Sequence, residues 1–226
     1  MSKTFAVMKT NVGNMVQDTS TSFAVLIGVW LNDKYLDISR RILWSALIDD
    51  NYTDLTEVGV AEYTLPTDFD EEIFVADITD GFQLKRYTEG MWWQERSTAY
   101  SGATISGGTA DRYVMLRESG KMKLDPTPNA IHTLAMPYKK SITALSADAS
   151  TVAIKDIEYI MELGAVGMAE FYKKQFNKAS NYTQLYEYEL AKRIGQERSP
   201  VNQLFQMNPD SYAPSAIRPM TGWESY

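Results

Sequence analysis

TSTSFAVLIGVWLNDKYLDISRRI, the stretch from residue 19 to residue 42, predicts a long α-helix. It opens with Thr and Ser residues, whose side chains accept hydrogen bonds from the first turn of a helix. Apolar side chains then recur at helical spacing, from Phe23 through Trp30 to Ile42. Charged residues such as Asp33 and Arg41 occupy the opposite side of the second half only. The first half is apolar nearly all round, so we expect it to be buried on more than one side.

Further helices are predicted on both sides of this one. A short helical segment over residues 10–18 precedes it, and helical periodicity returns from about residue 152. In the returning segment Gly164 and Ala165 are small enough to let a neighbouring helix approach closely, and Met168 follows on the same stripe. A last helix carries apolar residues in step from 182 to 194. We therefore expect a helical bundle, with Trp30, Gly164, Ala165 and Met168 as residues that pack its helices against neighbouring copies.

The region between about residues 62 and 146 has a different pattern. Short β-prone segments are separated by Gly and Pro at intervals of roughly 8 to 12 residues, which is typical of a small antiparallel sandwich or barrel. The expected strands lie at 63–66, 73–78, 82–87, 91–97, 103–105, 112–116, 121–124 and 131–138. The fold class predicted is therefore α+β, a helical bundle with an inserted β module. The expected domains are N-terminal helices (1–61), the β module (62–146), C-terminal helices (147–198) and an extended tail (199–226).

The C-terminal 28 residues are predicted to be an extended docking tail. They hold four of the eight prolines, which prevent a helix from continuing. They also hold large apolar side chains, and aromatic residues of this kind are enriched at protein interfaces. The expected partner-binding residues are Phe205, Tyr212, Ile217, Trp223 and Tyr226.

The composition is poor in catalytic groups. The 226 residues include no cysteine and one histidine, His132, which excludes disulfides, thiolate metal sites and multi-histidine centres. We therefore expect no enzyme activity, cofactor or metal. The formal net charge of −7 disfavours nonspecific binding to duplex DNA, which needs clustered Lys and Arg. The longest apolar run covers only residues 23–31, whereas a membrane span needs about 20, so no membrane partner is expected.

An acidic stretch from residue 49 to 95 is the basis for an alternative interpretation, a functional site built from carboxylates. It contains thirteen Asp and Glu residues against Lys85 and Arg86. The cluster Asp68, Asp70, Glu71 and Glu72, with Trp92 and Trp93 as a stacking platform, is the basis for a second hypothesis, a peptidoglycan- or carbohydrate-active module. A solvated acidic face is the interpretation that we favour for the carboxylates. For Trp92 and Trp93 we favour one ring in the core and the other facing a neighbour. His132 alternates with apolar neighbours and is interpreted as a structural or surface residue.

Four motifs in succession resemble the head–tail adaptor (connector) proteins of tailed bacteriophages. They are LIxxWLNxxYxxI at 26–38, YTLPxxF at 63–69, PYKKxxxAL at 137–145 and YxxxYEYELA at 182–191. The resemblance spans residues 10–198, and two features depart from the family pattern: the β insertion is long, and the tail aromatics do not align.

The resemblance implies a structural virion protein that is assembled in the host cytoplasm and lies at the head–tail junction. It implies a ring of about twelve copies beneath the portal, which joins the DNA-filled capsid to the tail. Its implied partners are further copies of the chain, the portal protein, a tail or nozzle protein, and double-stranded DNA that passes without specific binding. The C-terminal tail is expected to dock on the portal. A stopper or tail terminator of the same particle remains a third interpretation.

Overall fold

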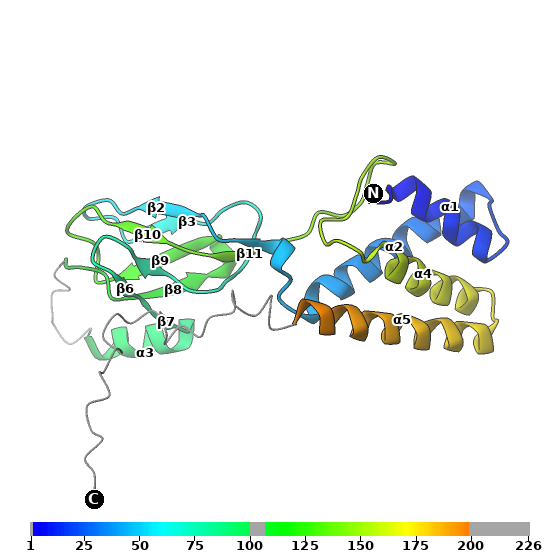
Figure 1. Cartoon of the computed structure of the whole chain (residues 1–226). Helices are drawn as coiled ribbons and strands as arrows, with labels where there is room; N and C mark the ends of the chain where they lie inside the picture. Colours follow the sequence, from blue (N-terminus) through cyan, green and yellow to red (C-terminus); the bar gives the residue numbers. More distant parts are fainter. Residues whose placement is uncertain (1, 100–106, 199–226) are drawn as a thin grey trace, which may run out of the picture. The chain divides into compact units, whose positions relative to one another are not determined.

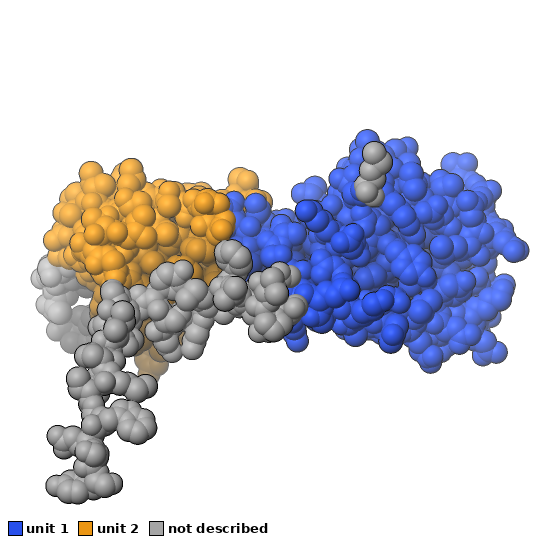
Figure 2. All heavy atoms as spheres, viewed as in Figure 1, with its two compact units in different colours: residues 1–49, 139–200 blue, residues 50–138, 201–226 orange. Residues whose placement is uncertain are grey.

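The protein has an α+β fold, described by a computed structural model over residues 2–99 and 107–198 (Figure 1). The chain divides into two compact units, drawn in blue and orange in Figure 2. The described part of unit 1 is formed by residues 2–49 and 139–198, and that of unit 2 by residues 50–99 and 107–138. The predicted tail, residues 199–226, and the predicted strand at 103–105 lie outside the described residues.

Unit 1 is built from four long helices. They are α1 (Phe5–Met15), α2 (Thr21–Arg41), α4 (Glu158–Tyr172) and α5 (Phe176–Glu197). A 3₁₀ turn, η1 (Ser45–Leu47), and the short strand β1 (Ile48–Asp49) follow α2, and β11 (Tyr138–Lys140) lies where the chain returns. The helix predicted from residues 19–42 is thus confirmed as α2. The helices predicted after residue 152 are α4 and α5, although Ile154 and Ile157 are buried in the turn that precedes α4.

Helix α4 is the centre of unit 1, because it packs against α1, α2 and α5 (Figure 1). Its side chains are buried on several sides, and Met161, Leu163 and Val166 have almost no exposed surface. The apolar first half of α2 contributes Ile27 and Leu31 to the same core, as its pattern predicted. Burial of an aliphatic side chain of this size is worth about 2 kcal/mol, so this continuous core stabilises the unit.

Two helices of unit 1 end in the same way, with a non-glycine residue in the left-handed conformation. Gln17 after α1 and Lys174 after α4 have φ angles of 54° and 61°. At the end of α4 the Lys174 amide donates to the Phe171 carbonyl, and the Gln175 amide donates to the Glu170 carbonyl. These two bonds define a Schellman motif, in which the residue with the left-handed conformation is usually glycine. The α4–α5 turn therefore retains backbone strain that a glycine would remove.

Unit 2 contains two four-stranded sheets. The first has the order β2 (Thr53–Leu55), β10 (Thr133–Ala135), β5 (Ala76–Asp77) and β6 (Phe82–Gln83), all antiparallel. The second has the order β3 (Glu62–Thr64), β9 (Lys121–Asp125), β8 (Arg112–Leu116) and β7 (Lys85–Tyr87). β4 (Phe69–Glu72) lies between β3 and β5 in the chain, and η2 (Arg117–Ser119) links β8 to β9.

The core of unit 2 comes from alternating strand residues. In β9, Met122 and Leu124 are buried while their neighbours are partly exposed, as strand geometry requires. Tyr113 and Met115 of β8 and Leu134 of β10 join the same cluster. One pair, β7 with β8, is parallel, which differs from the antiparallel module predicted. A parallel pair needs a crossover connection, and here the connection contains a helix.

That helix corrects the sequence prediction of a strand at 91–97. The segment forms α3 (Glu89–Ala99). Thr88 explains the difference, because its side-chain oxygen accepts a hydrogen bond from the Met91 amide and its carbonyl accepts one from the Trp92 amide. Thr at this position starts a helix, whereas the aromatic pair alone favours a strand.

The observed unit boundaries differ from the predicted insertion at 62–146. β2 pairs with β10 through residues 53–55, so the chain before residue 62 already belongs to the β sheets. After Tyr138 the loop is fastened to helices instead, since Asn32 and Leu145 exchange two hydrogen bonds.

Candidate functional site: an assembly surface on the helical unit

An aromatic cluster links α2 to the end of α4. Phe23 and Trp30 meet edge to face with ring centroids 5.6 Å apart, and Trp30 lies 5.8 Å from Tyr172. The Lys173 ammonium lies 5.0 Å from the Phe23 ring centroid, close enough for a cation–π contact. Trp30 is nearly buried, whereas Tyr172 is 61% exposed. The cluster therefore continues from the core to the surface.

The surface beside this cluster is apolar, and we call it the corner surface. It consists of Met168, Phe171, Tyr172 and Phe176. The first three lie on one face of α4 at spacings of three and four residues, and Phe176 begins α5. The Phe171 and Phe176 rings meet edge to face at 5.4 Å. Phe171 is 61% and Phe176 58% exposed.

A second exposed apolar row runs along α2. Val25, Val29 and Leu36 are exposed and share one face of the helix by their spacing. Single exposed apolar residues are ordinary, but contiguous ones mark interaction surfaces in soluble proteins. Unit 1 thus offers apolar surface on both α2 and the α4–α5 corner.

Gly164 and Ala165, two of the four residues predicted to pack copies together, are buried within their own chain. A Cβ atom at Gly164 would lie 2.9 Å from the Lys34 side chain and 3.0 Å from the Tyr186 ring, so α2 and α5 both approach α4 at this glycine. Ala165 has no exposed surface. Of the other two predicted residues, Met168 is exposed, and Trp30 is nearly buried with its ring beside that of Tyr172. The exposed Phe171 and Phe176 were not among the four predicted residues.

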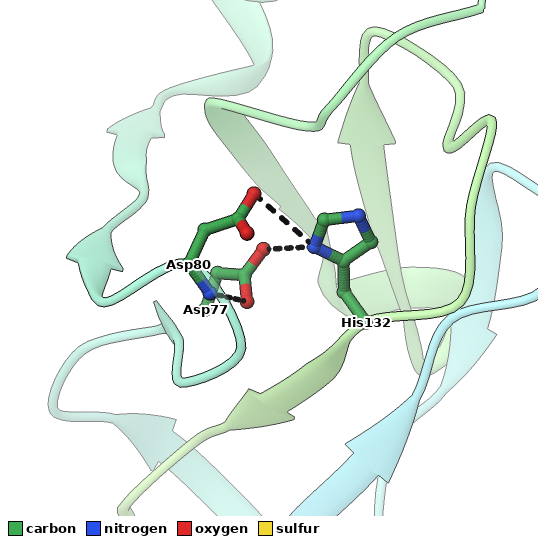
Figure 3. A group of neighbouring side chains, drawn as sticks. All are labelled: Asp77, Asp80 and His132. Carbon is green, nitrogen blue, oxygen red and sulfur yellow. Dashed lines mark hydrogen bonds and ion pairs between the residues drawn. The ribbon is translucent and has the colours of Figure 1, made fainter.

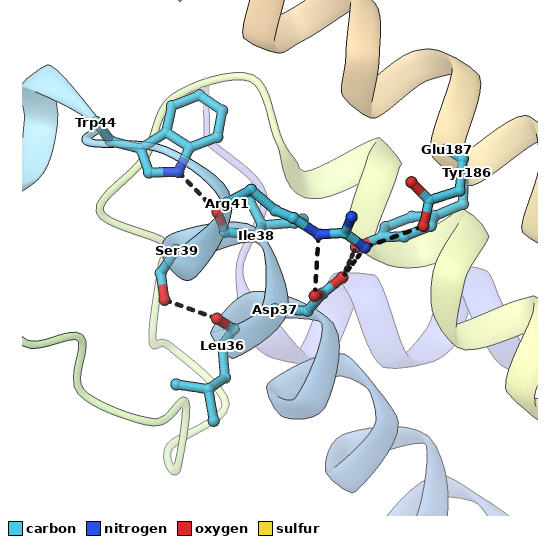
Figure 4. A network of polar contacts seen from close by, with 8 residues as sticks. All are labelled: Leu36, Asp37, Ile38, Ser39, Arg41, Trp44, Tyr186 and Glu187. Carbon is cyan, nitrogen blue, oxygen red and sulfur yellow. Dashed lines mark hydrogen bonds and ion pairs between the residues drawn. The ribbon is translucent and has the colours of Figure 1, made fainter.

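A polar network fastens α2 to α5 (Figure 4). The Arg41 guanidinium contacts both Asp37 oxygens at 3.1 and 3.0 Å, and it also reaches Glu187 at 3.0 Å. The Tyr186 hydroxyl donates to Asp37 at 2.6 Å. Close by, the Trp44 indole N–H donates to the Ile38 carbonyl at 2.7 Å. This network holds α2 and α5 in one arrangement.

The network also changes the acidity of its members. Burial opposes ionisation of Asp37, but the hydrogen bonds from Arg41 and Tyr186 outweigh it and lower the pKa of that carboxyl. Burial, together with the hydrogen bond to Asp37, raises the pKa of the Tyr186 hydroxyl. Asp37 is therefore held as a carboxylate and Tyr186 as a neutral donor.

The residues that carry the family resemblance contact one another in each unit. In unit 1, Asn32 of the first motif and Leu145 of the third share two hydrogen bonds of 3.1 and 2.8 Å. In unit 2, the Phe69 and Tyr138 rings lie 5.6 Å apart. The motifs are thus structural contacts of the fold.

The four carboxylates predicted as a cluster have different surroundings in the structure. Glu72 is buried beside the Arg86 guanidinium at 2.6 Å, Asp68 accepts a hydrogen bond from the Tyr138 hydroxyl, and Asp70 and Glu71 are exposed. Trp92 is buried with Tyr87 and Val114, while Trp93 is 63% exposed. The buried Trp92 ring and the exposed Trp93 ring agree with the interpretation that we favoured, although the two residues lie on a helix and not on a strand. A stacking platform that uses both rings is excluded, because the Trp92 ring has no free face.

One group of metal-ligating side chains is brought together in unit 2 (Figure 3). Asp77 ends β5, Asp80 follows in the next turn, and His132 precedes β10. The His132 Nδ1 atom lies 2.7 Å from Asp77 Oδ2 and 3.6 Å from Asp80 Oδ2. No local sequence pattern connects these residues, because 55 positions separate His132 from Asp77.

The two units differ in charge. Unit 1 has 14 Lys and Arg against 12 Asp and Glu, whereas residues 50–138 of unit 2 have 7 against 15. The negative charge of the chain therefore resides almost entirely in unit 2. Throughout residues 2–99 and 107–198, we find no helix with both the length and the apolarity to cross a bilayer.

A helical unit with exposed aromatic surface, joined to a small acidic β unit, defines a structural protein that assembles with others. The comparison with known families agrees. The SU10 adaptor protein family matches residues 3–204, and the chain belongs to this family of bacteriophage head–tail adaptors. It is therefore a structural virion component whose partners are other virion proteins. No curated protein matches the chain significantly.

Proposed function

We propose that the protein forms a ring beneath the portal and joins the DNA-filled capsid to the tail. The observation that carries this proposal is the corner surface, where Phe171, Tyr172 and Phe176 are each about three-fifths exposed on a rigid helix pair. Burying such side chains is worth about 2 kcal/mol each, enough for several together to stabilise a contact between copies. About twelve copies closing head to tail would give the ring expected of such adaptors.

The helical bundle of unit 1 builds the ring in this proposal, and unit 2 is an inserted β sandwich. Met168 and the aromatic residues of the corner surface meet the α2 face of the next copy, which holds Val25 and Val29. Different surfaces on the two sides of one copy make a heterologous contact, and such contacts close into rings. Gly164 and Ala165 support the interface indirectly by letting α5 approach α4.

Residues 199–226 are proposed as the arm that docks on the portal. Four prolines favour an extended backbone, which can add to a sheet edge or lie in a groove. Affinity comes from Phe205, Tyr212, Ile217, Trp223 and Tyr226. Because ordering an arm costs several kcal/mol, two or three of these anchors must act together.

Double-stranded DNA passes through the ring without specific binding in this proposal. The support is the charge distribution, because unit 1 has nearly balanced charge, with 14 basic against 12 acidic residues, and residues 50–138 of unit 2 have 15 acidic against 7 basic residues. Few phosphate contacts can form with such a surface, so DNA can slide. Tight, strongly salt-dependent binding of duplex DNA by the purified protein would contradict this part.

The docking proposal is tested by removing residues 199–226. The truncated chain should stay folded, with an unchanged far-ultraviolet circular dichroism spectrum, and should no longer attach to portal-bearing capsids in co-sedimentation. A matched full-length variant, Val58→Ser, replaces an exposed apolar residue of unit 2 and should attach normally. Attachment of the truncated chain at the wild-type level would overturn the docking role of the tail.

A further inference from the structure

The group formed by Asp77, Asp80 and His132 has the geometry of a three-ligand metal site. One oxygen of each carboxylate and one ring nitrogen of His132 all lie within 4.8 Å of one another. Ligands that bind one ion at about 2.0–2.1 Å lie about 3.3 Å apart. The distance from His132 Nδ1 to Asp77, 2.7 Å, is shorter than this value, and the distance to Asp80, 3.6 Å, is longer. For one ion to bind both pairs of ligands, the first distance would lengthen by about 0.6 Å and the second would shorten by about 0.3 Å.

The backbone that carries the three side chains is fixed from several directions. The turn after β5 closes through the Gly81 amide, which donates to the Asp77 carbonyl at 2.9 Å. The Ile78 amide donates to the Thr133 carbonyl, which ties this turn to β10. On the other side, the His132 amide donates to the Thr56 hydroxyl at 2.7 Å. Ligands held in place by the fold bind a metal without a large ordering cost.

The electrostatics of the group favour a cation. Asp77 is only 2% exposed, and its Oδ1 atom accepts the amides of Thr79 and Asp80. Its Oδ2 atom and an Asp80 oxygen both face the single Nδ1 atom of His132 (Figure 3). One N–H can donate to Asp77 at 2.7 Å, but at 3.6 Å it makes no hydrogen bond to Asp80. A divalent ion would satisfy all three groups at once.

We propose that Asp77, Asp80 and His132 bind one divalent transition-metal ion per chain, with Zn²⁺ as the best representative. Imidazole nitrogen is a good ligand for Zn²⁺, whereas Ca²⁺ takes oxygen ligands. Three protein ligands leave a fourth position of a tetrahedral ion for water or for a group from a partner. The ion joins the turn after β5 to the start of β10, so its role is to stabilise unit 2.

The test is isothermal titration of the full-length protein with Zn²⁺, and with Ca²⁺ as comparison. We expect binding of one Zn²⁺ per chain and a rise in the unfolding temperature with Zn²⁺ concentration that a chelator reverses. Asp80→Asn is the sharpest variant, because the Asp80 side chain is exposed and only its amide takes part in the turn. It should weaken Zn²⁺ affinity at least about tenfold, since loss of even an outer partner of a metal ligand has that effect.

Glu71→Gln removes an exposed carboxylate from the same unit and serves as the matched control, with unchanged Zn²⁺ affinity. His132→Asn should weaken Zn²⁺ binding as Asp80→Asn does, and circular dichroism verifies that both variants are folded. The proposal is overturned if the wild-type protein shows no one-to-one binding. It is equally overturned if Asp80→Asn binds Zn²⁺ as the wild type does, or if Ca²⁺ binds as tightly as Zn²⁺.

Discussion

The two units of this chain are stabilised in different ways and present different surfaces. Unit 1 buries one long helix, α4, among three others, and its surface carries exposed aromatic residues. Unit 2 joins strands of two to five residues around a smaller core, and its surface is strongly acidic. In the function that we propose, the helices provide the surface for assembly and the β unit provides the negative charge.

The largest effect is expected from a pair of tryptophans, one in each unit. Trp44 of unit 1 has no exposed surface, so Trp44→Ala should lower the free energy of unfolding by about 3–5 kcal/mol. Trp93 of unit 2 is largely exposed, and Trp93→Ala should change the free energy of unfolding by less than about 0.5 kcal/mol. Urea unfolding followed by circular dichroism measures both. Equal effects from the two variants would show that the core of unit 1 is assigned wrongly.

A smaller loss is expected when a buried acid of α4 is left without its partner. Glu162 is almost completely buried and contacts the Lys3 ammonium at 2.7 and 2.9 Å and the Asn11 amide at 2.8 Å. Lys3→Met should cost about 2 kcal/mol, less than for a fully buried pair because Lys3 is partly exposed. Thermal unfolding measures the loss. Adding Glu162→Gln to Lys3→Met should restore part of it, and a double variant less stable than Lys3→Met would contradict the pairing.

Acid should weaken unit 1 through Asp37. Burial raises the pKa of this carboxyl, but the hydrogen bonds from Arg41 and Tyr186 lower it by more. Its pKa in the folded state therefore lies below the ordinary value of 3.8. The unfolded chain then binds the proton more readily, and the stabilisation is present above about pH 4 and is lost as the pH falls below it. Asp37→Asn should flatten the dependence of thermal stability on pH between about 5 and 3. An unchanged slope would show that Asp37 does not contribute to it.

The smallest effect expected is a gain at the α4–α5 turn. Lys174 has a φ angle of 61° after the end of α4, so Lys174→Gly should raise the free energy of unfolding by about 0.5–1 kcal/mol. Gln184→Gly in the middle of α5 serves as control and should lower it by about 1 kcal/mol. Denaturant unfolding distinguishes the signs. A loss at both positions would indicate that the turn is not strained.

The sequence predicted the helices better than the strands for a physical reason. The 3.6-residue period of α2 extends over 21 residues, whereas most strands of unit 2 have only two or three, too few to show a period. The aromatic residues of 91–97 favour a strand, but Thr88 accepts the Met91 amide and starts a helix there. The proximity of His132 to Asp77 depends on β10 pairing with β5, which no local pattern reveals.

At the assembly surface, too, a local sequence pattern fits more than one structure. The small residues of α4 were correctly expected to admit a neighbouring helix, but the helices that approach Gly164 belong to the same chain. Packing inside one chain and packing between copies leave the same pattern in a sequence. Only the exposed fractions of Phe171 and Phe176 separate the two cases.

The most direct test of the assembly account is the native mass of the protein in the presence and absence of its portal. The account predicts weak self-association alone and a ring of about twelve copies on the portal. Phe171→Ser combined with Phe176→Ser should abolish the ring, while Val58→Ser, which replaces an exposed apolar residue of unit 2, should leave it intact. A wild-type chain that stays monomeric on the portal at high concentration, or a double variant that forms the same ring, would contradict the account.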